Sequence, residues 1–275
     1  MENNIKSSVI RIILLLIAII IVILFVFPLL WSIMSAFKTH AQAIAIPPIW
    51  LAKPTLNNFK EIFDHQPFLR FLINSIIVAV GSSIIVILLS IPAGYALARF
   101  NIRAKNNILF FILSTRMFPA IAIGIPFLLV FQKFHLIDSH IGLILAHTTF
   151  NLPIAIWLMR MFIIQIPKDI DEAVSIDGYT NLQIIVRLIV PLTRPAIMAI
   201  FFLVMTFSWN EFMFALMLAP NNAKTLPPAT VGLMGFGSIH WSVVSAAVTI
   251  MIIPMIIYLL SVQKSLMKGL AIGAV

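Results

Sequence analysis

Long blocks of apolar residues alternate with short polar connections along the chain. Each block is about as long as the roughly 20 helical residues that cross the hydrocarbon core of a bilayer. The blocks cover residues 12–34, 71–98, 108–131, 141–164, 196–218 and 243–262. They lack the strict alternation of membrane β-strands, and helices satisfy their own backbone hydrogen bonds in lipid. The pattern predicts an all-α membrane protein, a single domain over residues 1–275 with six transmembrane helices.

Basic residues precede the first block, as they do in a secretory signal peptide. Lys6 and Arg11 stand before the apolar stretch 12–34. That stretch is longer than the roughly 7 to 15 apolar residues of a signal peptide, and no convincing small-residue cleavage site follows it. We therefore expect it to remain as the first transmembrane helix.

Proline and glycine interrupt several of the predicted transmembrane helices. Both residue types are commoner in membrane helices than in soluble ones, so a kink accommodated by packing is the simpler interpretation. A hinge is the alternative. The interruptions are Gly81, Pro92, Pro119, Gly124, Pro126, Pro153 and Pro254.

Composition agrees with lipid as the surroundings of the chain. Of the 275 residues, 61% are hydrophobic and 10% are charged, and the mean hydropathy is +1.10. A typical soluble domain has about 25% charged residues. The net charge of +9 would suggest nucleic-acid binding in a soluble protein, but here the basic residues stand mainly between apolar blocks, where they anchor helices. We expect membrane lipid, and no nucleic acid, as a partner.

The distribution of basic residues predicts the orientation in the membrane. With both termini on one side, that side carries eleven lysines and arginines, and the opposite side carries six. Cytoplasmic loops carry the excess of basic residues in membrane proteins. We therefore expect both termini in the cytoplasm. The six opposite residues are Lys38, Lys53, Lys60, Arg70, Lys133 and Lys224.

Several kinds of active centre are missing from the sequence. The absence of cysteine excludes disulfides, thiolate metal sites and thiol nucleophiles. No Gly-x-x-x-x-Gly-Lys-Ser/Thr segment is present to hold nucleotide phosphates, so we expect no nucleotide site of this kind in the chain. The six histidines are scattered and include no pair four residues apart. We expect no enzymatic activity, no bound cofactor and no metal in this chain.

The connection 165–195, between the fourth and fifth predicted transmembrane helices, carries start and stop signals for two short helices. Pro167 suits the first position of a helix, and Gly178 suits its left-handed end. Thr180 and Gln183 form a capping-box pattern for the second helix. These signals predict a small, rigid structure on the cytoplasmic face.

Within this connection Glu172 and Ala173 are followed by Asp177 and Gly178, and then by Pro191 and Pro195. This order of residues resembles the EAA loop of permease subunits of binding-protein-dependent ABC importers. Val174 replaces the second alanine of the usual Glu-Ala-Ala. The resemblance implies that residues 165–195 form a coupling loop, which docks on a separate ATP-hydrolysing subunit and passes its movement to the membrane helices.

Other segments are similar to the smaller permease of maltose-type carbohydrate importers, over about residues 55–275. They are residues 115–119, 138, 142–145, 151–153, 157–160, 208–212 and 269–270. The resemblance implies a permease that moves a sugar or sugar alcohol across the bacterial cytoplasmic (inner) membrane by alternating access. It also implies three kinds of partner: a second homologous permease, a dimer of ATP-binding ABC subunits, and an extracytoplasmic solute-binding protein. Maltooligosaccharides, trehalose, polyols and glycerol phosphate remain open as substrates.

Polar residues inside the predicted helices are candidates for a translocation path. A charged side chain at the bilayer centre costs about 2.5 to 3.5 kcal/mol on insertion scales, so it normally faces protein or water. The candidates are Arg116, Asn151, Trp209, Asn210 and Glu211. One interpretation is that they join helices, and the other is that they line a solvated path and bind sugar. Proton coupling through Glu211 is the least favoured, because there is no second buried carboxylate.

A self-sufficient secondary transporter or channel is the alternative function. The coupling-loop pattern, the absence of an inverted repeat and the small number of helices argue against it. Residues 224–241, which contain several prolines and glycines, are a candidate outer loop for receiving the solute-binding protein, or equally a re-entrant packing segment.

Overall fold

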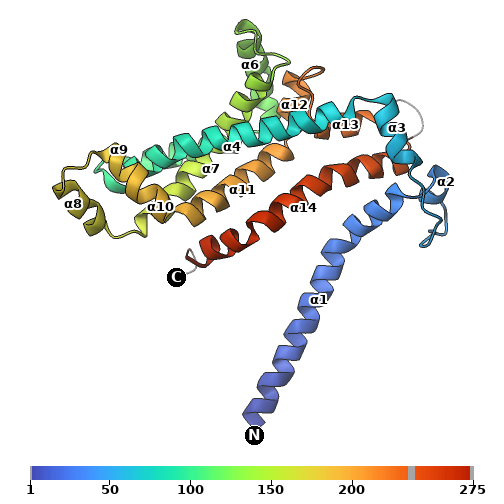
Figure 1. Cartoon of the computed structure of the whole chain (residues 1–275), viewed down its shortest axis with the longest axis horizontal. Coiled ribbons are helices and arrows are strands. Elements are labelled where there is room, and N and C mark those ends of the chain that lie inside the picture. The colour runs from blue at the N-terminus through green and yellow to red at the C-terminus, as the bar shows by residue number, and fades with distance from the viewer. Residues whose placement is uncertain (1, 235–238, 273–275) are drawn as a thin grey trace. The chain divides into compact units, whose positions relative to one another are not determined.

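The computed structural model describes residues 2–234 and 239–272 (Figure 1). All regular elements in these residues are helical, which confirms the all-α fold. Four helices are long and apolar enough to cross a membrane, and the number rises to six if each of two bent helix pairs counts as one span. The four are α1 (Glu2–Ala36), α4 (Phe68–Arg99), α7 (His140–Ile164) and α14 (Trp241–Ile272).

Contacts within the chain divide it into two compact units. The first consists of residues 1–67 and 230–253, and the second consists of residues 68–229 and 254–275. The single domain over residues 1–275 stays a prediction.

The first unit contains α1, α2 (His40–Ala43) and α3 (Asn57–His65). The side chain of Asn58 is buried and donates hydrogen bonds to the carbonyl oxygens of Ala36 (2.7 Å) and Lys38 (2.8 Å). These bonds hold α3 at the end of α1. In its most apolar stretch α1 has no buried residue, as expected of a helix that faces lipid or another subunit.

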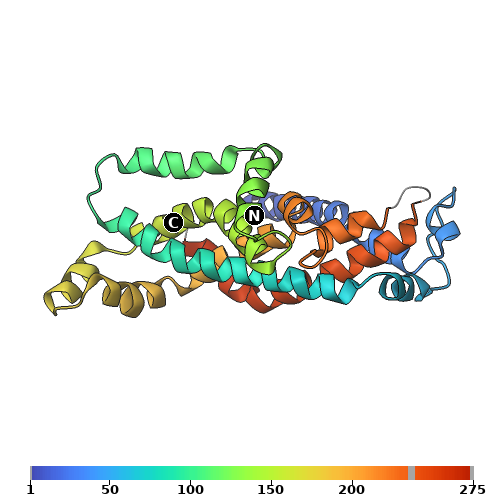
Figure 2. The same ribbon diagram turned by 90° about the horizontal axis from the view of Figure 1, so that it is seen from above.

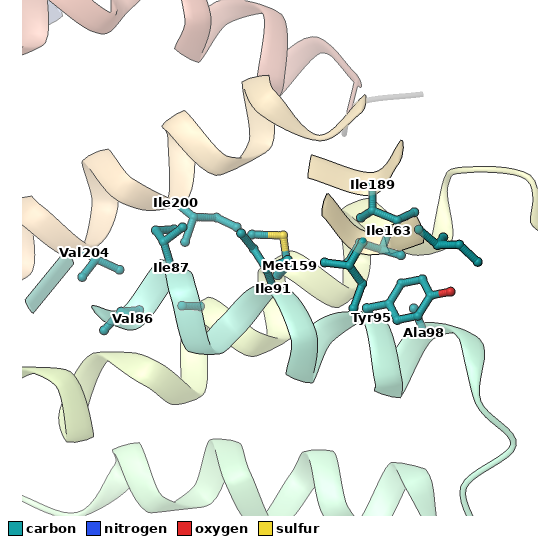
Figure 3. Packing of buried hydrophobic residues seen from close by; sticks show 13 residues of the cluster. Val86, Ile87, Ile91, Tyr95, Ala98, Met159, Ile163, Ile189, Ile200 and Val204 are labelled. Atoms are coloured by element: carbon teal, nitrogen blue, oxygen red, sulfur yellow. The ribbon is translucent and has the colours of Figure 1, made fainter. Parts of the chain in front are cut away.

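The centre of the second unit is a bundle of α4, α7 and α11 (Arg194–Trp209), which lie side by side. Mainly aliphatic side chains of these helices and of residues 184–189 pack together in what we call the aliphatic cluster (Figure 3). Because lipid is as apolar as these side chains, van der Waals packing rather than the hydrophobic effect holds such a cluster together. Its members include Val86, Ile91, Met159, Ile163, Ile189, Ile200 and Val204.

A separate cluster joins α6 (Ala120–Lys133), α12 (Met213–Leu218) and the start of α7. We call it the aromatic cluster, because the ring of Phe214 lies 5.3 Å from that of Phe127 and 5.9 Å from that of Phe150. Its buried members include Phe131, Leu143, Ala146, Phe214 and Leu218.

The third predicted transmembrane helix is broken. Its residues form α5 (Lys105–Ser114), the 3-10 turn η1 (Thr115–Met117) and α6, and the two parts meet at 92°. Figure 2 shows α5, in green, running apart from the chain that turns into α6. The break lies at Phe118, which is extended (φ −67°, ψ 129°) because the residue before a proline is pushed out of the helical region.

The fifth predicted helix is also two helices, α11 and α12, with residues 210–212 between them. α11 packs in the aliphatic cluster, whereas α12 packs in the aromatic cluster.

The predicted coupling loop, residues 165–195, forms short helices at one end of the α4–α7–α11 bundle (Figure 1). Pro167 caps the first of them rather than opening it, since that helix begins at Lys168. The stretch 181–192 then meets α11 at 82°. The elements are α8 (Lys168–Ile176), α9 (Asn181–Ile184), the π-helical turn η2 (Ile185–Ile189) and α10 (Val190–Leu192), while α13 (Leu226–Gly232) follows later in the chain.

Candidate functional site

Arg116 lies in η1, at the break of the third predicted helix. Its guanidinium carbon is 5.0 Å from the ring centroid of Phe150 and 4.5 Å from that of Phe207. Its Nη1 donates to the carbonyl oxygen of Phe150 (3.2 Å) and to Oδ1 of Asn151 (3.3 Å). The side chain forms no ion pair with a carboxylate in the described part of the chain. Aromatic faces and neutral oxygens therefore hold this cation.

A cavity of about 210 Å³ opens beside Arg116. Its walls are mainly apolar, and the hydroxyl-bearing residues Thr115 and Thr149 and the guanidinium supply the polar groups. Phe150 and Phe214 of the aromatic cluster form part of the same wall. An apolar pocket with a few polar groups is the usual form of a small-molecule site.

Glu211 lies at the break between α11 and α12 and caps α12. Its carboxylate accepts hydrogen bonds from the backbone amides of Phe214 (2.9 Å) and Ala215 (3.0 Å). A carboxylate at the N-terminal end of a helix satisfies free amides and complements the positive end of the helix dipole. The charge that the sequence places inside a transmembrane block is therefore held by backbone donors.

The other two candidates for the path do not face the cavity. Trp209 is 2% exposed, so protein covers its ring in this conformation and a sugar has no access to it. The Asn210 amide donates to the carbonyl oxygen of Thr206 (2.8 Å), one turn earlier in its own helix. Of the five predicted residues, only Arg116 lines the cavity. Asn151 is 2% exposed and does not line it, but its Oδ1 accepts a hydrogen bond from Arg116.

His147 is a residue that the sequence reasoning missed. Its side chain is 1% exposed, Nδ1 lies 2.6 Å from Oγ of Ser208, and Nε2 lies 3.3 Å from Oε2 of Glu211. Ser82 of α4 extends this series of polar contacts, because its Oγ lies 3.0 Å from Oγ of Ser208. The available signal was the spacing from Asn151, since residues four apart lie on one face of a helix.

The coupling loop is tied to α4 by a buried ion pair. Nε of Arg99 donates to Oδ2 of Asp171 (2.6 Å), and Nη2 reaches Oδ1 (3.3 Å) and the carbonyl oxygen of Ile166 (3.0 Å). Two contacts between one guanidinium and one carboxylate fix both position and angle. The pair therefore sets where α8 leaves the bundle.

The predicted docking residues of the loop lie at its surface. Glu172, Ala173, Asp177 and Gly178 are exposed, and the apolar side chain of Ile176 between them is 86% exposed. Gly178 has a φ of +84°, which favours glycine, and no atom lies within 4 Å of the place where a Cβ would stand. A larger residue there would meet nothing in this chain. Pro191 is exposed and Pro195 is half-buried where the loop turns into α11.

Comparison with known proteins identifies the class. Residues 90–271 match the family described as binding-protein-dependent transport system inner membrane component. The chain belongs to this family. It is therefore a permease component of a binding-protein-dependent transport system, and a multi-pass membrane protein.

Named relatives of this permease span nearly its whole length. It is 33% identical to the trehalose/maltose transport system permease protein MalG of Thermococcus litoralis, over 96% of each chain. It is also 33% identical to the sulfoquinovosyl glycerol transport system permease protein SmoH of Agrobacterium fabrum, over 90% of this chain and 87% of the relative. A solved bacterial ABC transporter for import of the acidic polysaccharide alginate has the same fold, with a TM-score of 0.74, 23% identity and coverage of 94% and 97%.

A hydrogen-bonded hub fixes the part of the permease that leads into the candidate outer loop. The carboxylate of Asp138 accepts from the amides of Asn221 (3.1 Å), Asn222 (2.8 Å) and Ala223 (3.2 Å). Burial opposes ionisation of this group, but these amides outweigh it and hold the pKa of Asp138 below its usual value. The Asn74 amide donates to the carbonyl oxygen of Asn222 (3.0 Å). Residues 235–238 of the candidate loop lie outside the described residues.

Proposed function

We propose that this permease is the membrane subunit of an ATP-driven importer that takes up a sugar or sugar alcohol by alternating access. The match of residues 90–271 to the permease family carries the proposal. Relatives named for trehalose, maltose and a sulfoquinovosyl glycerol support a carbohydrate as the substrate. The alginate transporter solved with its pentasaccharide-bound periplasmic protein supports delivery by an extracytoplasmic solute-binding protein.

In this proposal the energy comes from other subunits. A dimer of ATP-binding ABC subunits binds ATP and Mg, and this chain binds neither. The exposed surface of the coupling loop around Glu172, Ala173 and Gly178 docks on one of these subunits. A second homologous permease completes the pore, because one coupling loop engages one of two ATPase subunits.

The cavity beside Arg116 is our candidate for part of the translocation path. Arg116 supplies donors for sugar hydroxyls, the hydroxyl oxygens of Thr115 and Thr149 supply acceptors, and the rings around the cavity provide apolar faces. Asn151 holds the guanidinium of Arg116 in place. Asn210, Glu211 and Trp209 do not line it in this conformation, and we propose that they shape the break beside it.

The permease is proposed to lie in the bacterial inner membrane with both termini in the cytoplasm. Because the chain has no cysteine, single cysteines report topology without background. A cysteine at position 173 should resist a membrane-impermeant thiol reagent in intact cells. Labelling from outside would contradict the orientation.

Uptake in living cells tests the energy source. Cells that carry the permease and its partners should lose uptake of labelled trehalose, maltose or a polyol when ATP is depleted, and should keep it when the proton gradient is dissipated with ATP maintained. A strain without this chain is the control. Uptake that follows the ion gradient instead would support the secondary transporter.

A further inference from the structure

The break at residues 210–212 separates two half-helices that pack in different places. Ile200 and Val204 of α11 belong to the aliphatic cluster, and Phe214 and Leu218 of α12 belong to the aromatic cluster. α11 follows directly from the coupling loop, whereas Phe214 lines the cavity beside Arg116. Any movement that reaches the cavity along this route must cross the break.

One imidazole touches both sides of this break. Nδ1 of His147 lies 2.6 Å from Oγ of Ser208 on α11, and Nε2 lies 3.3 Å from Oε2 of Glu211, which caps α12. His147 comes from α7, a continuous helix that contributes to both clusters. It therefore stands on a fixed support beside the break.

The donors and acceptors fit a single arrangement of the neutral imidazole. Oγ of Ser82 donates to Oγ of Ser208, and the Ser208 hydroxyl can then donate to Nδ1 of His147. An ionised Glu211 only accepts, so the proton belongs on Nε2. The polar groups of Ser82, Ser208, His147 and Glu211 then form one row of contacts, which starts on α4 and ends at the cap of α12.

The contact to Glu211 is the looser of the two. Nε2 is buried and lacks hydrogen-bond geometry to any atom in the described residues, even though the Glu211 carboxylate lies 3.3 Å away. The 2.6 Å contact to Ser208 is much shorter. A buried donor that is close to its acceptor but misaligned becomes a full hydrogen bond after a small displacement. The contact can thus change with the angle between α11 and α12.

We propose that His147 is a positioning residue for transport, which joins the two half-helices across the break and passes movement of α11 to α12 and to the cavity wall at Phe214. This inference rests on the proposed function. It assigns His147 no contact with the substrate and no transfer of a proton.

Two substitutions at position 147 separate the contacts. The amide nitrogen of Gln can take the place of Nε2 and keep the contact to Glu211, whereas Asn can take the place of Nδ1 and keep only the contact to Ser208. With the purified transporter in proteoliposomes, we expect His147→Asn to lower the maximal uptake per ATP at least about tenfold with an unchanged KM for the loaded binding protein. His147→Gln, which loses the contact to Ser208, should show a comparable loss. Ser83→Ala, which removes a buried hydroxyl that bonds to Ala79 of its own helix, is the control and should stay within about twofold of wild type. Normal uptake by either variant at position 147 would overturn the proposal.

The distance between α11 and α12 provides a second readout, which does not depend on transport activity. Spin labels on cysteines at Met198 of α11 and Leu216 of α12, which are 37% and 48% exposed, report the joint between the half-helices. The distance distribution should be broader in His147→Asn and in His147→Gln than in wild type or Ser83→Ala. An unchanged width in His147→Asn would contradict the proposal.

A substitution at Ser208 tests the proposal if the His147 variant fails to assemble. If His147→Asn does not assemble, Ser208→Ala removes the α11 contact alone and should lower uptake per ATP in the same way, and normal uptake by it would overturn the proposal. A wild-type transporter without any ATP-dependent uptake would instead refute the proposed function.

Discussion

The two halves of the broken fifth helix sit in surroundings of different kinds. α11 packs among branched aliphatic side chains such as Val86, Ile91 and Ile163. α12 packs among phenylalanine rings, beside a cavity of about 210 Å³. Interlocked aliphatic side chains have few alternative arrangements, whereas rings beside open space can move. We propose that α11, next to the predicted coupling loop, transmits movement, and that α12, next to the cavity, responds to it.

The largest effect should come from breaking the link at the coupling loop. Gly178→Leu should reduce uptake to background while the helices stay inserted, because the added side chain meets nothing in this chain and would stand where we propose that the ATPase docks. The left-handed backbone adds about 1–2 kcal/mol for any residue with a Cβ. Gly178→Ala carries the same backbone cost without the bulk and should retain much of the uptake. If Gly178→Leu binds the ATPase and transports normally, the loop is not the docking site.

The ion pair between Arg99 and Asp171 should be the next most sensitive point. Removing one partner of a buried pair costs about 3–5 kcal/mol, because the other charge is left unpaired. Asp171→Ala should therefore lower thermal stability and weaken ATPase attachment, and Arg99→Leu combined with Asp171→Leu should cost less than the sum of the single changes. Additive effects would show that the two groups do not interact.

A substitution at Arg116 should affect only the region of α12 and the cavity. Arg116→Leu removes the only charged group in the cavity lining that the structure describes, and we expect uptake to fall about tenfold, or about 1.4 kcal/mol. Arg116→Lys should fall less, because the charge remains. Arg103→Leu, at an exposed site outside the membrane blocks, is the matched control. Uptake by Arg116→Leu equal to that of the control would remove the cavity from the path.

How far the sequence predicts the structure differs between these regions. The capping box of Thr180 and Gln183 and the positive φ of Gly178 are present where the pattern places them, because such signals act within one turn of chain. The contact of His147 with Glu211 depends on how α7 faces α11 and α12, and no local pattern contains that information. Docking by the loop itself stays a prediction.

Proline shows the same limit. Pro119 follows an extended residue at the sharp break before α6, whereas Pro153 is buried inside a continuous α7. Both prolines stand in similar apolar blocks, and the sequence left kink and hinge open for each. The packing around Pro153, to which distant residues contribute, compensates for the lost hydrogen bond.

The smallest expected effect concerns the hub at Asp138. Asp138→Asn keeps the shape but loses the charge that three amides stabilise, and we expect a loss of about 1 kcal/mol at pH 7. Because the folded pKa lies below the unfolded value of about 3.9, the stabilisation is complete above that value and disappears as the pH falls through the folded pKa. Thermal unfolding should therefore show a constant difference from wild type between about pH 5 and 8, and a smaller one below about pH 4. A difference that grows in acid would contradict this assignment.

Uptake by proteoliposomes of defined composition tests the central claim most directly. Liposomes with this permease, its homologous partner, the ATPase subunits and the loaded binding protein should accumulate labelled sugar only when ATP is hydrolysed, and liposomes with this chain alone should accumulate none. Accumulation by this chain alone, driven by an ion gradient and indifferent to ATP, would contradict the account.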